Sequence, residues 1–363
     1  MREPYREILV VDLLGGIGDL VMLLPVVHGL ARRNPGASLR VLTHEPGAAL
    51  LRGDPAVTRV LTPRHDGAGA EREAVTEALA ARRPDLAVTT TRYDGIPDLL
   101  AASGARCVTD LWCRPPPDEP VGERYLRILL AEGLLRPEDA LARPAVRLTP
   151  AEIAYGESAL AHHLPASGTG PPVVLITDAG MDVKRWPAGR WRELAALLAR
   201  RGHPLLTPDA PPKRDRADAK DAVFGPEVAV LPQCGLRGLA ACFAAVARRG
   251  GVAVGGDTGP LRLAAAAGAA TVGLFGPTWA GRYGLRPSTG SGLLGGAADL
   301  QGLPGCPHRR PTAITEQPCW WTAGCPLSPA GPACMADISV ASVVRAVTRL
   351  CAGSPMRHPA DDG

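Results

Sequence analysis

Three short motifs in this 363-residue chain combine residue types that could bind or transfer a charged group. The first is a glycine-rich turn, Gly15-Gly16-Ile17-Gly18, which leads into Asp19. A carboxylate at the start of a helix, facing a cleft, could accept a proton from a substrate hydroxyl. An acid in the same place also serves as a helix cap, which would stabilise the helix by about 1 kcal/mol. Both interpretations of Asp19 are open on this segment alone.

The second motif is the run Gly255-Gly256-Asp257-Thr258-Gly259-Pro260 at the end of an apolar stretch. Free backbone N–H groups at the helix start, together with the Thr258 hydroxyl, would form a cradle for a diphosphate. An acid repels phosphate, so we expect Asp257 to organise the loop rather than to contact the ligand. The alternative interpretation is an ordinary helix capped by Asp257 and Thr258.

The third motif is Lys184-Arg185-Trp186-Pro187, which precedes a helical pattern. A lysine in a loop at the same sheet edge would balance the charge of a leaving phosphate. The alternative is a solvated Lys184 beside a buried Trp186.

Arg262 lies five positions after Asp257, on the first turns of the helix that the second motif begins. A guanidinium there could bind a diphosphate oxygen through charge-assisted hydrogen bonds. Alternatively, Arg262 points to solvent and pairs with a nearby acid. We also place Thr177, at the end of an expected strand, among the donor-binding residues.

Alternating strand and helix patterns position these motifs. Apolar runs followed by glycine turns and helical periodicity are typical of an α/β fold with parallel sheets. A dinucleotide fingerprint G-x-G-x-x-G fails because Val21 stands three residues after Gly18, which argues against a Rossmann oxidoreductase. The length fits two α/β domains. Expected strands are 8–14, 39–43, 59–61, 85–89, 173–177, 228–231, 251–254 and 271–275, and expected helices are 71–82, 124–132, 188–201, 236–246, 260–267 and 338–351.

Composition limits the classes of partner. The chain is 46% hydrophobic and 21% charged, with a net charge of +4 and scattered arginines, so nothing indicates a nucleic-acid partner. No uncharged apolar run reaches the length of a membrane span, and the N-terminus shows no signal-peptide pattern. We expect a cytoplasmic protein without a transmembrane segment, and peripheral contact with a membrane stays open.

Four of the nine cysteines crowd into one C-terminal segment. Cys306, Cys319, Cys325 and Cys334 are separated by 13, 6 and 9 residues, which are not the close pairs of common zinc motifs. They could bind structural zinc through four thiolates, or through three thiolates and His308. They could also form a disulfide. We expect unlinked thiols, and no metal in the catalytic site.

The order of the three motifs resembles the glycosyltransferase family 9 pattern of ADP-heptose:lipopolysaccharide heptosyltransferases. The resemblance runs from about Ile8 to about Leu350. The residues that carry it are Asp19 with Pro25, Lys184 with Trp186 and Pro187, the run 257–266, the run 274–278, and Cys334-Met335 with Ile338.

This resemblance implies a GT-B fold, in which two Rossmann-like domains with parallel sheets face a cleft. We expect residues 1–165 to form an acceptor-binding domain and residues 166–336 a domain that binds the nucleotide sugar. Residues 337–352 would form a helix that crosses back to the first domain, and residues 353–363 a flexible tail.

The implied reaction is an inverting, metal-independent transfer of a sugar, most simply a heptose from ADP-heptose, to an acceptor hydroxyl. ADP-heptose would be a co-substrate, and no further cofactor is implied. By similarity, Asp19 is the general base, and Lys184, Thr258 and the amide of Gly259 hold the diphosphate. Gly16, Gly18 and Arg92 are placed on the acceptor side.

Two departures from the family leave a second function open. Arg262 stands where the family usually has histidine, and the family's acidic donor-binding residue has only Asp209 as a weak match. The first domain also lacks a basic cluster, because Arg92, Arg114 and Arg124 are isolated. The acceptor could be a small natural product or a cell-envelope glycan. The alternative is a catalytically impaired nucleotide-sugar binding protein of the same fold.

Overall fold

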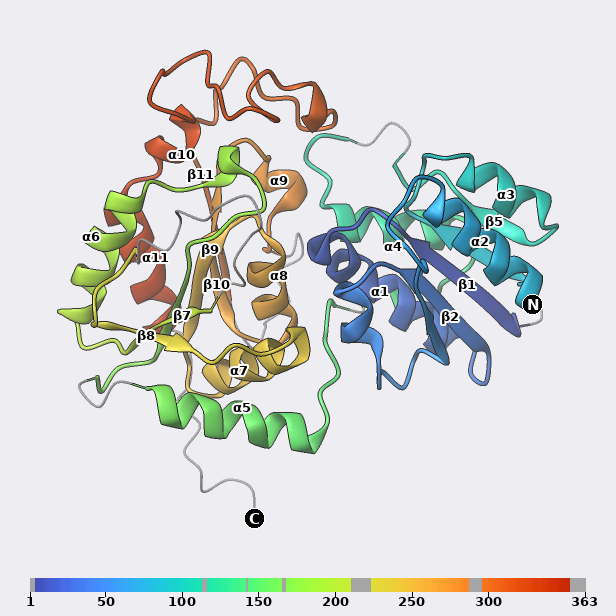
Figure 1. The fold of residues 1–363 in the computed structure, drawn as a ribbon, viewed down its shortest axis with the longest axis horizontal. Helices are drawn as coiled ribbons and strands as arrows, with labels where there is room; N and C mark the ends of the chain where they lie inside the picture. The colour runs from blue at the N-terminus through green and yellow to red at the C-terminus, as the bar shows by residue number, and fades with distance from the viewer. Residues whose placement is uncertain are drawn as a thin grey trace. The chain divides into compact units, whose positions relative to one another are not determined.

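The structure, a computed structural model, describes residues 4–112, 116–141, 143–164, 168–209, 223–286 and 296–352. These residues form two compact units, each built on its own parallel sheet (Figure 1). The first unit contains the described residues up to 149, except that Pro116–Pro120 group with the second unit, which continues from residue 150. Each unit is described here by itself.

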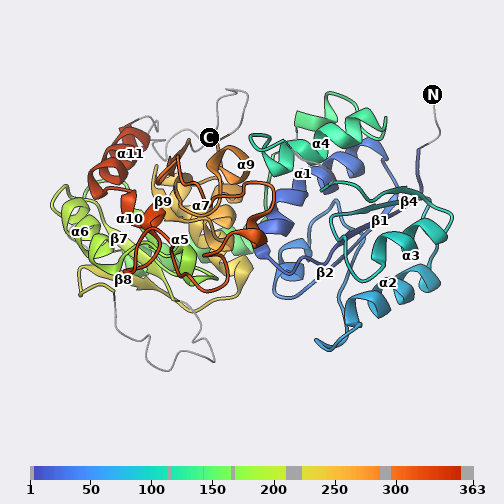
Figure 2. The ribbon, with the colours of Figure 1, turned by 90° about the horizontal axis from the view of Figure 1, so that it is seen from above.

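The sheet of the first unit has five parallel strands in the order β3-β2-β1-β4-β5. Helices α1 and α4 cover one face and α2 and α3 the other (Figure 2). Because both faces are covered, the central strand is a continuous apolar run in which Ile8 to Val11 are fully buried. The elements are β1 Glu7–Asp12, α1 Ile17–Arg33, β2 Ser38–Thr43, β3 Arg59–Leu61, α2 Ala70–Ala81, β4 Leu86–Thr89, α3 Ile96–Ala102, β5 Arg106–Val108 and α4 Val121–Ala131, with short 3-10 helices η1 Gly47–Leu51 and η2 Asp139–Leu141.

The second unit has six parallel strands in the order β11-β10-β9-β6-β7-β8. Helices α6 and α11 lie on one side of this sheet, and α7 and α8 lie on the other (Figure 1). The elements are α5 Pro150–His163, β6 Val173–Ile176, η3 Asp182–Lys184, α6 Ala188–Ala199, β7 Leu205–Pro208, β8 Val228–Leu231, α7 Leu236–Arg248, β9 Val252–Gly256, α8 Gly259–Ala266, β10 Ala270–Phe275, α9 Ala280–Tyr283, β11 Ala297–Gln301, η4 Ile314–Glu316, α10 Ala333–Asp337 and α11 Val340–Ala352.

The boundary between the units falls earlier in the chain than expected. Helix α5, which the expected boundary at residue 165 places in the first domain, packs along α7 of the second unit. Gly156 allows this close approach, because a Cβ on it would lie 2.2 Å from the carbonyl oxygen of Ala241. Ion pairs between Arg237 and Glu152 then hold the two helices together.

The last helix also differs from its expected position. We expected residues 337–352 to cross back to the first domain, but α11 packs on α6 and on the sheet of the second unit. Its buried stripe, which includes Val343 and Val347, belongs to the same apolar core as Trp191 of α6. The stripe therefore completes the second core. The expected tail, 353–363, lies outside the described residues, as do Cys113, Arg114 and Ser167.

None of the helices that the structure describes is long and apolar enough to cross a lipid bilayer.

Candidate active site

The first group of candidate residues meets at the carboxyl edge of the second sheet. Strands β6 and β9 are neighbours, with Ile176 opposite Gly255, so Thr177 and Asp257 both leave the sheet at this edge. Glycine is needed here because a Cβ on Gly256 would lie 3.2 Å from the carbonyl oxygen of Lys184. The close approach of the two loops places Lys184 beside the start of α8. Ligands of open α/β sheets bind at this edge.

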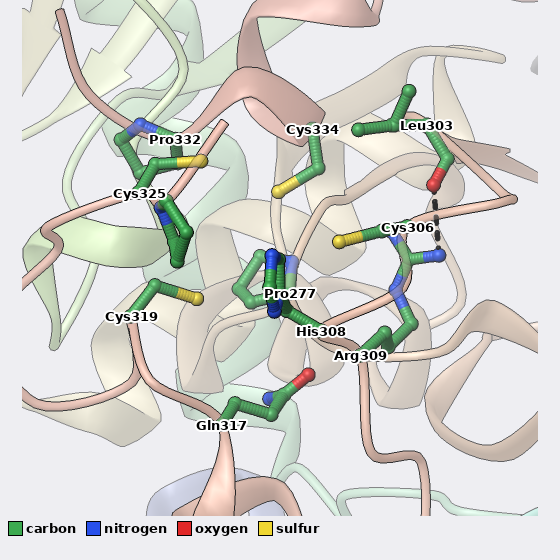
Figure 3. A pocket seen from close by; sticks show the side chains of 11 residues that line it. Pro277, Leu303, Cys306, His308, Arg309, Gln317, Cys319, Cys325, Pro332 and Cys334 are labelled. Carbon is green, nitrogen blue, oxygen red and sulfur yellow. Dashed lines mark hydrogen bonds between the residues drawn. The ribbon is translucent and has the colours of Figure 1, made fainter. Parts of the chain in front are cut away.

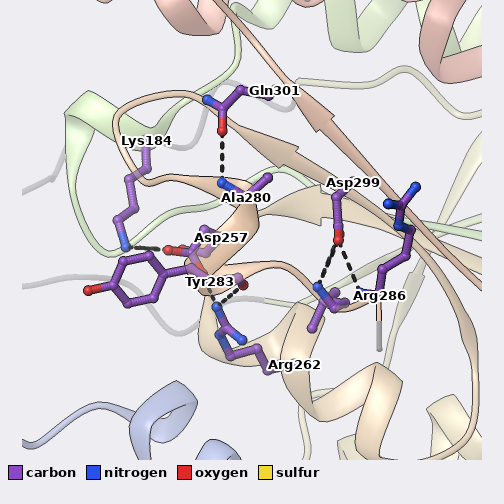
Figure 4. Close-up of polar contacts among 9 residues, drawn as sticks. Lys184, Asp257, Arg262, Ala280, Tyr283, Arg286, Asp299 and Gln301 are labelled. Atoms are coloured by element: carbon purple, nitrogen blue, oxygen red, sulfur yellow. Dashed lines mark hydrogen bonds and ion pairs between the residues drawn. The ribbon is translucent and has the colours of Figure 1, made fainter. Parts of the chain in front are cut away.

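Asp257 connects two cations that the sequence analysis singled out separately (Figure 4). Its Oδ2 lies 3.1 Å from Nζ of Lys184, and its Oδ1 accepts a hydrogen bond of 2.7 Å from Nη2 of Arg262. The same lysine Nζ also donates to the backbone carbonyl of Asp257, at 3.3 Å. Asp257 therefore joins the loop before α8 to Lys184 and Arg262, while its position relative to a ligand stays a prediction.

The charge state of Asp257 follows from these contacts. Burial alone would favour the neutral acid, but Lys184 and Arg262 outweigh it and hold the pKa of Asp257 well below its usual range. Two cations and one carboxylate leave the group with one net positive charge. An anionic ligand would be attracted to that charge.

Thr258 begins α8 but does not cap it with its side chain. It is the N-cap residue with no side-chain cap hydrogen bond, and its Oγ1 is buried without a partner. A buried hydroxyl without a partner is costly, so this atom is suited to a ligand oxygen. Because the Asp257 carboxylate is taken by two cations, an ordinary capped helix does not account for the motif.

Arg262 occupies neither of the two positions that the sequence left open. It is 6% exposed, and Nη2 donates to Asp257 and to the carbonyl oxygen of Tyr283. It thus pairs with a nearby acid while being buried rather than solvated. Its hydrogen bonds join the α8 and α9 segments and support Asp257, and its expected direct role toward phosphate stays a prediction.

Lys184 is held from a second side by an aromatic ring. Its Nζ lies 5.2 Å from the ring centroid of Trp320, within the range of a cation–π interaction. The loop that carries it is anchored by Trp186, whose Nε1 donates to the carbonyl oxygen of Ile338 at 3.0 Å. Lys184 is therefore not a freely solvated side chain. The sequence analysis missed Trp320, for which only its place beside Cys319 offered a signal.

Asp19 lies at the corresponding edge of the first sheet, in the first turn of α1. The N-cap of this helix is Gly16, so Asp19 is not the cap residue. A Cβ on Gly16 would lie 2.3 Å from Oδ2 of Asp19, which shows that the carboxylate lies over the glycine turn. The glycine therefore leaves room for this carboxylate, and Asp19 itself is partly buried.

A second carboxyl group, Asp12, lies at the end of β1 and was not predicted. Thr90, which follows β4, donates its hydroxyl to Oδ1 of Asp12 at 2.6 Å. Burial is the main cause that raises the pKa of Asp12 to about 7; the hydrogen bond from Thr90 opposes this rise, and the negative charge of Asp19 adds to it. The only sequence signal was a lone acid in an apolar strand. The edge thus carries two interacting acids with different environments.

The remaining predicted residues are less closely gathered. Gly18 lies within the first turn of α1, and Arg92 is exposed on the loop after β4. Arg124 is buried and donates from Nε to the carbonyl oxygen of Leu111, at 2.9 Å, which is a structural contact. Asp209 is exposed just after β7, and its assignment as the missing donor-binding acid stays a prediction. The acceptor side therefore has no assembled cationic group among the described residues.

Taken chemically, the second unit offers a hydroxyl, an ammonium and helix N-terminal amides to an anion, and the first unit offers a carboxylate to a proton. In the part of the chain that the structure describes, no group of three His, Cys, Asp or Glu side chains is gathered tightly enough to hold a metal ion.

Comparison with known proteins gives a consistent result. The profile of glycosyltransferase family 9 (heptosyltransferase) matches residues 143–291. A lipopolysaccharide heptosyltransferase 1 from Pseudomonas aeruginosa is 38% identical over 118 residues, which are 31% of this chain and 32% of that protein. The match thus spans about a third of the relative's length.

Solved structures match along nearly the whole chain. A glycosyl transferase family 9 protein from Veillonella parvula has a TM-score of 0.73 at 16% identity, covering 97% of this chain and 99% of its own. The ADP-heptose lipopolysaccharide heptosyltransferase II of E. coli has a TM-score of 0.66 at 17% identity, covering 95% and 98%. An E. coli heptosyltransferase solved with ADP has a TM-score of 0.58 at 21% identity, covering 94% and 99%.

At these identities the solved structures establish the GT-B fold, and the profile covers the segment that holds Lys184, Asp257 and Arg262. Residues 143–291 are thus similar to glycosyltransferase family 9 (heptosyltransferase), and the solved structures extend the likeness in fold to nearly the whole chain.

Proposed function

We propose that this protein transfers a heptose from ADP-heptose to an acceptor hydroxyl, with inversion at the anomeric carbon and without a metal ion at the diphosphate. The observation that carries the proposal is the group at the start of α8, where a cationic cluster lies beside the buried, unpartnered hydroxyl of Thr258. The E. coli relatives were solved with ADP and with ADP-2-deoxy-2-fluoro heptose, which supports an ADP-sugar as the donor.

The donor diphosphate would be bound by three kinds of group. The amides of Thr258 and Gly259 point out of the N-terminal end of α8, where the helix dipole favours an anion. The Thr258 Oγ1 would supply the hydrogen bond that it lacks within the protein. Lys184 would turn from Asp257 toward the β-phosphate as that group gains charge during bond breaking. Thr177, at the same edge, completes the proposed donor set.

Asp19 would act as the general base in the first unit. Its carboxylate takes the proton of the acceptor hydroxyl while the acceptor oxygen attacks the anomeric carbon. The bond from that carbon to the β-phosphate oxygen breaks, and its electron pair leaves with ADP. Attack from the side opposite the leaving group inverts the configuration. Gly16, Gly18 and Arg92 are the proposed contacts for the acceptor.

The acceptor that we propose is a small natural product or a cell-envelope glycan, because the exposed Arg92 is the only predicted acceptor-side cation near this edge among the described residues. A cytoplasmic location is part of the proposal. The eight cysteines that the structure describes are all free, as is usual in a reducing compartment.

The experiment is to incubate the full chain with ADP-heptose and to follow ADP release with and without candidate acceptors. Acceptor-dependent release of ADP, with a product heavier by one heptose, supports the proposal. UDP- and GDP-linked sugars serve as donor controls. Tight binding of ADP-heptose without turnover on any acceptor would favour the alternative, a nucleotide-sugar binding protein.

A further inference from the structure

The segment between β11 and α10 brings four cysteines together that the proposed reaction does not use. This four-cysteine cluster consists of Cys306, Cys319, Cys325 and Cys334. Their sulfur atoms point into one small cavity of about 10 Å³ (Figure 3). That volume is about what one water-sized particle occupies. All four thiols are free, so the disulfide considered from the sequence is not what the structure shows.

A buried positive charge lies beside the cluster. Arg309 lines the same cavity and is 8% exposed. Its guanidinium donates to the backbone carbonyls of Gly276, Gly302, Leu303 and Pro304 at 2.8–3.2 Å. Among the described residues it has no carboxylate partner, and the ring of Trp279, whose centroid lies 5.6 Å from Cζ, gives it a cation–π contact but no negative charge. Thiolates in the cavity would supply the missing negative charge.

Apart from hydrogen bonds such as those of Arg309, the segment has little regular structure to hold its shape. Between β11 and α10 it contains one short 3-10 helix, η4, and an isolated bridge between Cys325 and Ser328. Its large apolar side chains do not all contribute to a core: Trp320 is buried, whereas Trp321 is 71% exposed and Leu327 is 47% exposed. A segment with so little regular structure and so small a core gains much from a cross-link.

We propose that the four-cysteine cluster binds one thiophilic divalent ion through four thiolates. Such ligand sets select zinc or iron over magnesium or calcium. Each cysteine releases its thiol proton to solvent as its sulfur binds the ion. In the arrangement that the structure describes, no three of these side chains are close enough to share an ion. Binding would therefore require the Sγ atoms to move closer together, and a change of χ1 rotamer is the motion by which a cysteine moves its sulfur.

The ion would act by holding the segment and not by taking part in sugar transfer. Besides the four cysteines, prolines, Leu303, His308, Arg309 and Gln317 line the cavity, and its volume of about 10 Å³ is too small for a sugar. Because Trp320 follows Cys319 directly, closing the cluster would also fix the ring that lies over Lys184. This last consequence rests on the proposed function, whereas the ion content does not.

The test measures zinc and iron in the full chain purified under reducing conditions without chelator. We expect one ion per chain, and we expect it to be lost in a variant that combines Cys306→Ser with Cys319→Ser. The matched control is Cys107→Ser, which removes a thiol of the first unit and should keep the ion. Which of the two metals is present distinguishes a zinc site from an iron site.

A second measurement uses the wild-type chain, so that the test does not depend on whether the doubly substituted variant folds. The wild-type chain is stripped of metal and titrated with Co²⁺, which gives a thiolate-to-cobalt charge-transfer band when it has several thiolate ligands. Saturation at one equivalent, together with protection of these four cysteines from alkylation, supports the proposal. Absence of bound zinc and iron and absence of the cobalt band would overturn it, as would metal retained in the doubly substituted chain.

Discussion

At the scale of single residues, the donor site is governed by how charges are shared. Asp257 is bonded to both Lys184 and Arg262, so neither cation is independent of the other. In the first unit, the negative charge of Asp19 adds to the burial that raises the pKa of Asp12. These pairings decide what each substitution should do.

Asp19→Asn should lower turnover by about 10²-fold or more while leaving ADP-heptose affinity nearly unchanged, because only the proton acceptor is removed. Steady-state rates and a donor titration measure the two effects separately. Asp98→Asn, which changes an exposed acid of α3, is the control for a general loss of charge. A rate close to wild type in Asp19→Asn would exclude this residue as the base.

Asp12→Asn should make stability less dependent on pH. The pKa of Asp12 is raised to about 7 in the folded protein, so the folded state binds more protons than the unfolded state between its ordinary value and 7. Wild-type stability therefore falls as pH rises through this window. The asparagine keeps an acceptor for the Thr90 hydroxyl and carries no charge. The difference in melting temperature between variant and wild type should grow in favour of the variant from about pH 5 to about pH 8. A constant difference would show that Asp12 does not titrate there.

Arg262→Ala should weaken ADP binding by about 1 kcal/mol through Lys184, because Asp257 would then hold the lysine alone. It should also destabilise the fold by about 3–5 kcal/mol, since one partner of a buried ion pair is lost. The deciding comparison uses Asp257→Asn as background, in which Arg262→Ala should change ADP affinity little. An equal loss in both backgrounds would instead indicate direct contact between Arg262 and phosphate, and calorimetric titration with ADP measures it.

At the scale of elements, the sequence predicted the strands that are marked by clear runs of apolar residues. Strand β3 and strand β8 have the predicted bounds, and β1, β2, β4, β6, β9 and β10 differ by one or two residues at their ends. These strands lie inside a sheet or carry clear apolar runs. The missed strands β5, β7 and β11 are short or partly exposed, so their residues lack a clear apolar pattern. Helix α5 was missed because only Gly156 and Leu160 of it are buried.

The candidate site was predicted to a similar extent. Lys184 and Asp257 come together because the loops that follow parallel strands lie at the same edge of the sheet. The order of strands and motifs along the chain is enough to predict this proximity. The partner of Arg262 could not be predicted, since it depends on whether the guanidinium turns inward. Asp12 and Trp320 were missed because their importance lies only in what they touch.

The start of α8 leads to a prediction about divalent ions. In the proposed donor site, helix amides and Lys184 would supply the positive charge that Mg²⁺ supplies in other diphosphate sites, so adding Mg²⁺ or Mn²⁺ to a chelated assay should not raise the rate. The zinc and iron content is measured before and after chelation, so that loss from the four-cysteine cluster is not mistaken for an effect at the diphosphate. Restoration of a lost rate by Mg²⁺ alone would contradict the proposed donor site.

At the scale of the whole molecule, each unit has a complete core of its own, and the sequence predicted this duplication. It placed the boundary too late and the last helix on the wrong unit, because helix periodicity shows that a face is buried but not which surface covers it. The packing of α11 on α6 closes the second core around Trp191. The second unit is thus built from residues at both ends of the range 150–352.

The contact between Lys184 and Trp320 should make the tryptophan fluorescence of the second unit sensitive to a bound ligand. Indole emission depends on the electric field at the ring, and a buried indole is shielded from the solvent that would otherwise dominate it. Phosphate that draws the ammonium away from the ring would change this field, so ADP should shift the emission spectrum. Trp320→Phe should abolish the shift but keep ADP binding in calorimetry, whereas Trp321→Phe, which changes the exposed neighbour, should keep both. The enzyme would then report occupancy of its own donor site without an added label.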